Sequence, residues 1–176
     1  MVGITQETIK DTKGQMDLIE LSNRIAGMAQ VHEQLYKKDD ITNIDFKQYV
    51  NDLSENITAS YSQEGLVIDQ QIEEGINISF NKAVPLGLII NELLTNAYKY
   101  SRDKNKEAMV SIEVSKENDN LKIKVSDNGK GFPDGLNLNN LTSYGLKLAN
   151  GLTQQLNGTI KLYNAGGANV EVVVPV

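Results

Sequence analysis

The order of apolar and polar residues predicts a long helix that includes residues 86–99. With successive residues placed about 100° apart, its apolar positions fill one arc of about 100°. They are Leu86, Ile89, Ile90, Leu93 and Ala97. A separate arc of about 60° holds the polar residues Glu92, Asn96 and Lys99. We therefore expect a helix with a core face and a polar stripe, and Pro85 suits its first turn.

A strict alternation of apolar and polar residues predicts a β-hairpin after this helix. Apolar residues occupy every second position in residues 110–114 and in residues 121–125, and the polar residues 117–120 separate the two runs. The second run continues into Asp127, after which glycines interrupt the pattern. The hairpin therefore delivers a carboxylate at the end of a strand.

The same patterns predict the remaining elements of the core. They are a helix through residues 46–57, a strand through 66–72, and strands near 159–163 and 170–174 that turn at 165–167. A last helix opens at Gly145 and Leu146, with a core face that consists of Leu148, Leu152 and Leu156. We expect an α+β fold: a two-layer α/β sandwich whose mixed, mostly antiparallel sheet is covered by helices on one face, preceded by an N-terminal helical segment.

An apolar seam runs along the N-terminal segment. Its members repeat at alternating steps of three and four residues and are Leu18, Leu21, Ile25, Met28, His32 and Leu35. This spacing is typical of a helix packed against other helices. A dimeric helical bundle is the first interpretation, and a helix of a monomeric globular domain is the alternative. In either case His32 points into helix packing, so we expect it to be structural.

The polar stripe of the helix that includes residues 86–99 and the strand-end Asp127 both suit the binding of a nucleotide. An amide, a carboxylate and an ammonium on one stripe suit a magnesium-bound polyphosphate, because a hard cation takes oxygen ligands and lysine binds phosphate. An ionised Asp127 accepts hydrogen bonds only, and so suits an exocyclic amine such as that of adenine, while glycines let a ligand approach the backbone. The alternatives are a solvated helix face and a plain Asp-Asn-Gly turn.

The composition of the chain indicates which classes of binding partner and which cellular location to expect. Among 176 residues the net charge is −6 and there is no cysteine. Without a cluster of lysines and arginines, a nucleic-acid surface is not expected. The longest apolar run has eight residues, from Ala83 to Ile90, against the roughly 20 that a bilayer requires. We expect no membrane contact from this segment and a cytoplasmic location, which includes the cytoplasmic part of a membrane-bound sensor.

From Asp45 to Val176 the chain resembles the ATP-binding domain that sensor histidine kinases share with gyrase-type ATPases. The resemblance rests on four motifs in order, namely E-x-x-x-N-A-x-K-Y, D-x-G-x-G, S-x-G-L and G-G. It implies ATP and Mg²⁺ as cofactors, with Asn96 at the metal, Asp127 at adenine, and Glu92 and Lys99 in catalysis. The other nucleotide-binding residues that it implies are Tyr100, Gly129, Gly131, Ser143, Gly145 and Leu146.

One residue departs from the pattern of these proteins. Their glycine pair is commonly followed by a threonine whose hydroxyl supports the adenine site, whereas this chain has Ala168. We expect one hydrogen bond to be missing, at a cost of about 0.5 to 1.5 kcal/mol in nucleotide binding.

The N-terminal residues are similar to the second helix of the dimerisation and phosphotransfer hairpin in one subgroup of sensor histidine kinases. The similarity rests on residues 9–11, 22–25, 28–36 and 44–46. In that subgroup the phosphorylated histidine lies upstream in an H-R-x-K-N-N-L-type box, which this sequence lacks; we expect the first helix to be truncated or missing. The predicted division is a partial hairpin segment at 1–40 and an ATP-binding catalytic domain at 41–176.

Three functions are compatible with these residues. The first is a kinase module that passes the γ-phosphoryl group of Mg-ATP to a histidine on a dimerisation hairpin, with a homodimer formed by the N-terminal helices and a response regulator receiver domain as partners. The second is an ATPase in which Glu92 activates water. The third is a nucleotide-binding module without catalysis. The seam favours the kinase.

Overall fold

The computed structural model describes residues 43–60, 67–101, 109–141 and 143–176, together with Ser22 and Ile25. Apart from Ile25, the residues of the N-terminal seam, His32 included, therefore lie outside the described residues. The described helices are α3 (Phe46–Ser60), α4 (Phe80–Ser101) and α5 (Tyr144–Gln155). The strands are β1 (Asn43–Asp45), β2 (Val67–Ile72), β3 (Asn77–Ser79), β4 (Met109–Glu117), β5 (Asn120–Asp127), β6 (Thr159–Asn164) and β7 (Ala168–Pro175).

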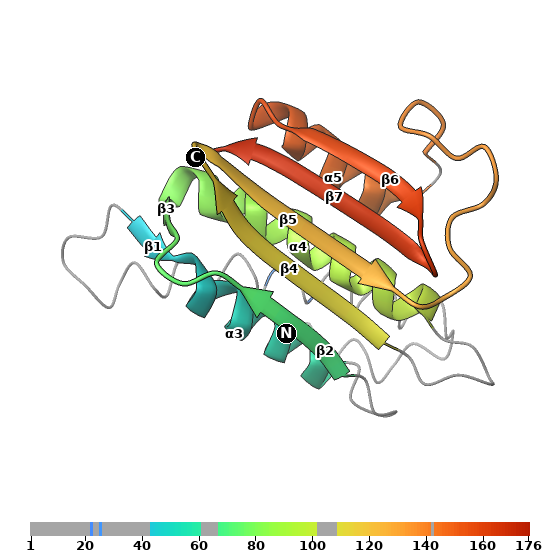
Figure 1. The fold of residues 1–176 in the computed structure, drawn as a ribbon, viewed down its shortest axis with the longest axis horizontal. Helices are drawn as coiled ribbons and strands as arrows, with labels where there is room; N and C mark the ends of the chain where they lie inside the picture. Colours follow the sequence, from blue (N-terminus) through green and yellow to red (C-terminus); the bar gives the residue numbers. More distant parts are fainter. Residues whose placement is uncertain (1–21, 23–24, 26–42, 61–66, 102–108, 142) are drawn as a thin grey trace.

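Five of these strands form a mixed sheet in the order β2-β4-β5-β7-β6. β2 pairs with β4 in parallel, and the other neighbours are antiparallel. All three helices lie behind the sheet in Figure 1, so that they cover one face of it. This arrangement confirms the predicted two-layer α+β fold. A short pair of strands, β1 and β3, joins α3 to the start of α4.

The core lies between this sheet and α4. All five apolar positions predicted for the core face of this helix are buried: Leu86, Ile89, Ile90, Leu93 and Ala97. They meet the inward side chains of β4 and β5, which alternate as predicted and include Ile112, Ile123 and Val125. Burial of so much apolar surface is the main stabilising contribution to such a domain.

Two details of the helices differ from the sequence predictions. α4 begins at Phe80, so Pro85 lies inside the helix rather than in its first turn. The hydrogen-bonded strand β3 ends at Ser79, and the chain turns directly into the helix there. Proline is a typical start signal, but because α4 follows β3 directly, Pro85 lies beyond the first turn, where it is buried.

The buried face of α5 also differs from the prediction. Its buried residues are Gly145, Leu146, Ala149 and Thr153. Leu148, Leu152 and Leu156 are only partly buried, and Leu152 and Leu156 pack at the edge of the core. Small residues on the inner face let α5 approach α4 closely, which a leucine face would prevent.

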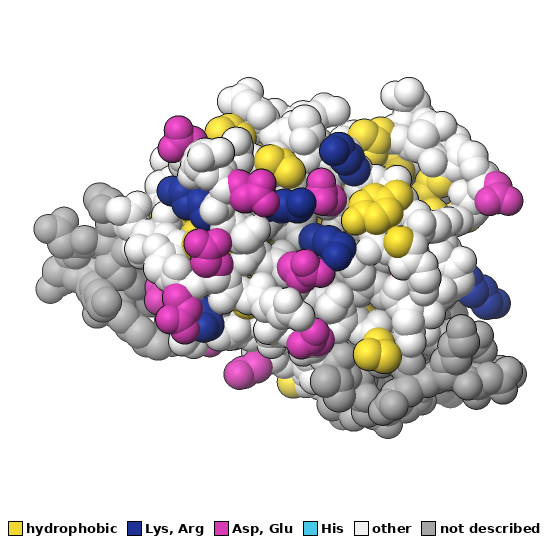
Figure 2. Space-filling view, in the orientation of Figure 1, with side chains coloured by type: hydrophobic (Ala, Val, Ile, Leu, Met, Phe, Trp, Pro, Cys, Tyr) yellow, Lys and Arg dark blue, Asp and Glu magenta, His cyan; other side chains and the backbone are white. Residues whose placement is uncertain are grey.

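The second face of the sheet is open and charged. Lysines and acidic residues alternate across it in Figure 2. Lys124 Nζ lies 2.7 Å from Glu113 Oε1, and Lys122 Nζ lies 3.1 Å from Glu171 Oε2. Within the described ranges, none of the helices has both the length and the apolar composition needed to cross a membrane.

Candidate active site

A cavity of about 470 Å³ opens between α4, the sheet and the segment that precedes α5. α4 contributes Leu93, Asn96, Ala97 and Tyr100, and the strands contribute Val125, Asp127, Ala168 and Val170. The loops and α5 contribute Lys130, Gly131, Phe132, Pro133, Leu136, Ser143 and Leu146. Most of these side chains are apolar, and a few polar groups converge among them. Such a lining is typical of sites for small organic ligands.

Asp127 is the only acidic residue among the described residues that line the cavity. Its Oδ1 accepts hydrogen bonds from the backbone N–H groups of Gly129, at 2.8 Å, and Ala168, at 3.2 Å. Burial raises the pKa of this carboxyl, and the two N–H groups partly oppose the rise. Both bonds use the same oxygen, so the second carboxylate oxygen is available to accept a hydrogen bond from a ligand amine.

The polar stripe of α4 meets the N-terminus of α5. A Cβ atom on Gly145 would collide with Oε2 of Glu92 and would lie 3.3 Å from Nδ2 of Asn96. Only a glycine lets the backbone of α5 come this close to both side chains. The contact places a carboxylate and an amide at the positive end of a helix, where a polyphosphate would also be stabilised.

The polar stripe is not a fully solvated face: Asn96 and Lys99 are half-buried and Glu92 is buried. Glu92 is 1% exposed, and Nδ2 of Asn96 is buried without a hydrogen-bond partner. A buried amide without a partner costs free energy, which a bound ligand would recover. The unpaired amide therefore points to a ligand at this end of the cavity.

The same two side chains fit a magnesium ion held jointly with a polyphosphate. Magnesium is commonly bound by one or two protein oxygen ligands together with substrate phosphates and water. Asn96 offers an amide oxygen and Glu92 a carboxylate. In the described part of the chain, no group of three or more His, Cys, Asp or Glu side chains could hold a metal by itself. A site that needs the phosphates to complete it is consistent with this donor set.

Six of the ten predicted site residues line the cavity: Asn96, Tyr100, Asp127, Gly131, Ser143 and Leu146. The other four are Glu92, Lys99, Gly129 and Gly145, which are absent from the lining. Three of these four still contact it, because Gly129 bonds Asp127 and Gly145 packs on Glu92 beside Asn96. Lys99 is half-buried near the end of α4 and is not brought to the cavity.

Lys130 is the cationic side chain that lines the cavity, and the sequence analysis did not single it out. It lies inside the D-N-G-K-G motif, and this position was the signal that could have identified it. Among the described residues it makes no ion pair and no hydrogen bond through its ammonium group. The apolar wall that contains Phe132, Pro133 and Leu136 was also missed, because a loop of mixed composition does not reveal which side it turns to a ligand.

Hydrogen bonds fix both ends of the segment between β5 and α5. At its start, the Asn164 side chain accepts from the Phe132 N–H at 2.8 Å and donates to the Phe132 carbonyl at 3.0 Å. At its end, Ser143 caps α5, with Oγ accepting from the Leu146 N–H at 3.4 Å. Ser143 thus faces the cavity and holds the helix N-terminus together.

Comparisons with known proteins agree with this geometry. Residues 81–176 match the family model described as "Histidine kinase-, DNA gyrase B-, and HSP90-like ATPase", and residues 1–61 match one described as "Histidine kinase". The chain is 27% identical over 164 residues to the sensor histidine kinase PdtaS of Mycolicibacterium smegmatis, covering 90% of this chain and 32% of that protein. PdtaS of Mycobacterium tuberculosis is 25% identical over 94% of this chain and 33% of its own length. The chain thus spans about a third of these relatives.

Solved structures show the same fold. The histidine kinase domain of the blue-light activated kinase EL346 from Erythrobacter litoralis has a TM-score of 0.79 at 19% identity, covering 99% of this chain and 92% of that one. The histidine kinase AdeS of Acinetobacter baumannii has a TM-score of 0.64 at 19% identity, over 98% and 89% of the two chains. Full-length ShkA in complex with AMPPNP has a TM-score of 0.64 at 15% identity, over 93% and 36%. With its ATPase-domain match over more than half of its residues, this chain belongs to the family of histidine kinase-, DNA gyrase B- and HSP90-like ATPases.

Proposed function

We propose that this chain is the ATP-binding catalytic part of a sensor histidine kinase, which transfers the γ-phosphoryl group of Mg-ATP to a histidine on a helical hairpin in two-component signalling. The observation that carries the proposal is the position of Asp127, which lines a largely apolar cavity with one carboxylate oxygen already bonded to two backbone N–H groups. The matches to histidine kinase models at both ends of the chain support it.

The adenine ring would occupy the apolar part of the cavity. Leu93, Ala97 and Val170 offer flat apolar contact, and Asp127 would accept a hydrogen bond from the exocyclic amine. A guanine base carries a carbonyl at the corresponding position, and two acceptors would then face each other. The carboxylate therefore favours adenine over guanine, because an unpaired buried polar group costs roughly 1 to 3 kcal/mol.

The phosphates would lie toward the N-terminus of α5. The polar groups there are Ser143, the backbone of Gly145, and the side chains of Glu92 and Asn96. When bound, Mg²⁺ would supply charge neutralisation on the phosphates, with Asn96 as a direct ligand and Glu92 beside it. Lys130 adds a cation at the cavity, and Lys99 would need a rearrangement of the end of α4 to reach the nucleotide.

Phosphoryl transfer asks mainly for positioning and charge stabilisation from the protein. The bond between the γ-phosphorus and the bridging oxygen to the β-phosphate breaks, and ADP leaves with the electron pair. A bond forms between the phosphorus and an imidazole nitrogen of the acceptor histidine. In this scheme Glu92 stands close to the phosphates as a base for the acceptor, a role that its position beside Asn96 permits.

The other parts of the machinery are proposed as follows. A homodimer would form through the N-terminal helices, and a response regulator receiver domain would take the phosphoryl group from the histidine. The location would be cytoplasmic.

The proposal is tested with γ-labelled ATP and Mg²⁺. The chain is incubated alone, with a separately prepared phosphotransfer hairpin of a related kinase, and with the same hairpin whose acceptor histidine is replaced by glutamine. We expect acid-labile label on the intact hairpin only. Release of labelled inorganic phosphate without labelled hairpin would indicate an ATPase instead. Binding of ATP with neither product would indicate a nucleotide-binding module, and either result contradicts the kinase proposal.

A further inference from the structure

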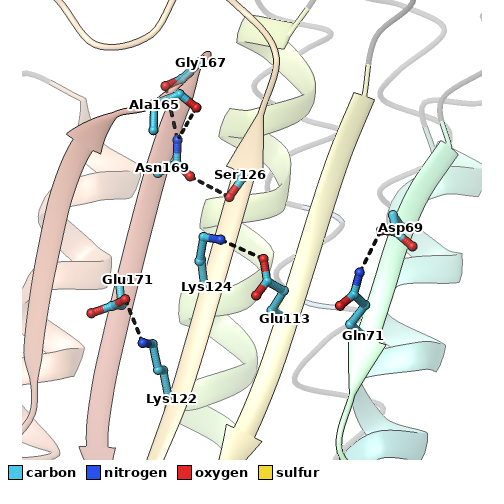
Figure 3. Close-up of polar contacts among 10 residues, drawn as sticks. All are labelled: Asp69, Gln71, Glu113, Lys122, Lys124, Ser126, Ala165, Gly167, Asn169 and Glu171. Atoms are coloured by element: carbon cyan, nitrogen blue, oxygen red, sulfur yellow. Dashed lines mark hydrogen bonds and ion pairs between the residues drawn. The ribbon is translucent and has the colours of Figure 1, made fainter.

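A buried asparagine lies on the open face of the sheet, on the opposite side from the cavity. Asn169 on β7 is 4% exposed, although the same face of the sheet carries charged residues such as Lys124 and Glu171 (Figure 3). It sits between Ser126 of β5 and Tyr163 of β6 in the strand register. A buried amide at this place is costly unless its hydrogen bonds are satisfied.

Both the amide nitrogen and the amide oxygen of Asn169 have hydrogen-bond partners, as Figure 3 shows. Nδ2 donates to the carbonyl of Ala165 at 3.4 Å and to the carbonyl of Gly167 at 3.2 Å. Oδ1 accepts from the hydroxyl of Ser126 at 2.8 Å. Because carbonyls only accept, the amide can adopt only this orientation, and the Ser126 hydroxyl must donate.

The two carbonyls belong to the turn between β6 and β7. The Ala165 N–H also donates to the Gly167 carbonyl at 3.0 Å, so this turn is closed on itself. Gly167 packs directly on the backbone of Asp127, and a Cβ atom there would collide with the Asp127 carbonyl. The next residue, Ala168, donates its N–H to Oδ1 of Asp127 at 3.2 Å. A chain of contacts thus leads from Asn169 through the turn to the carboxylate.

We propose that Asn169 is a positioning residue for base recognition: it locks the glycine turn that presents the Ala168 N–H to Asp127. The proposal rests on the proposed function, in which Asp127 receives the adenine amine. Without the Asn169 amide, two carbonyls lose a donor and the turn is free to move away from the strand end. The Asp127 carboxylate then loses one of the two N–H groups that fix its orientation.

This role predicts an effect that general destabilisation would not produce. The N–H groups of Gly129 and Ala168 lower the pKa of Asp127, while burial raises it. Losing the Ala168 bond raises that pKa further. The ionised carboxylate is acceptor-only and is the stronger acceptor for the amine, whereas the protonated form places a donor in the site. Nucleotide binding in the variant therefore weakens at a higher pH than in the wild type. Among the described residues, Lys130 and Tyr100 are the other ionisable groups that line the cavity, and they are unchanged in the variant.

The experiment measures the affinity for Mg-ADP by calorimetry at a series of pH values from neutral to mildly acidic. Asn169→Ala is expected to weaken binding by about three- to tenfold at neutral pH and to move the acidic loss of affinity to higher pH. Asn169→Asp is expected to bind Mg-ADP more weakly still, because the new carboxylate would face the carbonyls of Ala165 and Gly167. Ser126→Ala leaves Asn169 in place but frees its amide, and a smaller loss in the same direction is expected.

Asn77→Ala is the matched control. Asn77 also donates its amide to a turn carbonyl two residues back, that of Gly75 at 3.1 Å, but it is not among the residues that line the cavity. It should leave Mg-ADP affinity and its pH dependence unchanged. If folded Asn169→Ala and Ser126→Ala bind Mg-ADP with the affinity and pH dependence of the wild type, the role of Asn169 is overturned, and the proposed function is not affected. A wild type that binds no Mg-ADP would overturn the proposed function and the inference with it.

Discussion

Burial raises the pKa of the Asp127 carboxyl, while hydrogen bonds from two backbone N–H groups lower it. The net rise affects both the stability of the fold and the binding of a ligand. The folded state therefore holds the proton more tightly than the unfolded chain does. The stabilising contribution of this group is complete at low pH and is lost as the pH rises through the raised pKa. At neutral pH the ionised carboxylate thus opposes folding, and we infer that it is kept for its ligand.

Asp127→Asn should therefore be as stable as the wild type at neutral pH, or slightly more stable. An asparagine Oδ1 can still accept from the N–H groups of Gly129 and Ala168, while the unfavourable buried charge is removed. Urea denaturation followed by circular dichroism measures the free energy of unfolding. A large destabilisation at neutral pH would show that the carboxylate serves the fold rather than a ligand.

At the scale of elements, the close approach of α5 to α4 forms the end of the cavity at which we propose that the phosphates bind. Gly145 and Gly151 lie on the same helix, but only Gly145 faces Glu92, and a Cβ atom on Gly151 would meet nothing within 4 Å. The two glycines therefore offer a matched pair of alanine substitutions.

Gly145→Ala should weaken binding of Mg-ATP by at least tenfold, because its methyl group would push α5 away from Glu92 and Asn96. Gly151→Ala should leave binding unchanged and stabilise the protein by about 0.5 to 1 kcal/mol, since alanine is a better helix former. Calorimetry and thermal unfolding measure both effects. Equal binding by the two variants would contradict the placement of phosphates at the N-terminus of α5.

The segment that precedes α5 is the element expected to respond to nucleotide. It is held to the sheet at Phe132 by Asn164, and its own asparagines bond one another, with Asn140 Oδ1 accepting from the Asn137 N–H at 2.7 Å. Few strand or helix hydrogen bonds protect its backbone. Its amides should exchange rapidly in the free protein and become protected with a bound, non-hydrolysable ATP analogue. Hydrogen exchange read by mass spectrometry tests this, and unchanged exchange across 132–141 at saturating analogue would refute it.

At the scale of the whole molecule, the sequence predicted the fold where the apolar pattern is regular. The spacing of apolar residues was enough to predict the core face of α4 and the β4–β5 hairpin. Asp127 lies at the end of β5 as predicted. The helix start predicted from Pro85 was wrong. The predicted core face of α5 was right only in part, since Leu152 and Leu156 pack against the core from its edge while smaller residues are buried nearer α4. Neither a proline signal nor a leucine count shows how closely two helices pack. Lys130 and Asn169 could not be found from the pattern, since their roles depend on which loops and strands become neighbours in space.

The lone histidine offers a test of the whole chain. His32 lies outside the described residues, and its place on the apolar seam predicts helix packing, because phosphorylation there would force a dianion into an apolar contact. We expect no acid-labile label on the chain after incubation with γ-labelled ATP, and unchanged Mg-ATP affinity in His32→Gln. Label that is present in the wild type and lost in a folded, ATP-binding His32→Gln variant would make His32 the acceptor.

The most direct test of the central claim is a calorimetric titration of Mg-ATP into the wild type and into Asp127→Asn at neutral pH. The wild type should bind one equivalent. The variant, although folded, should lose at least severalfold in affinity, because an amide mixes donor and acceptor where the adenine amine needs an acceptor alone, and a mispaired buried group costs roughly 1 to 3 kcal/mol. Equal affinity in the two proteins would contradict the assignment of Asp127 to adenine, and with it the account of this cavity as an ATP site.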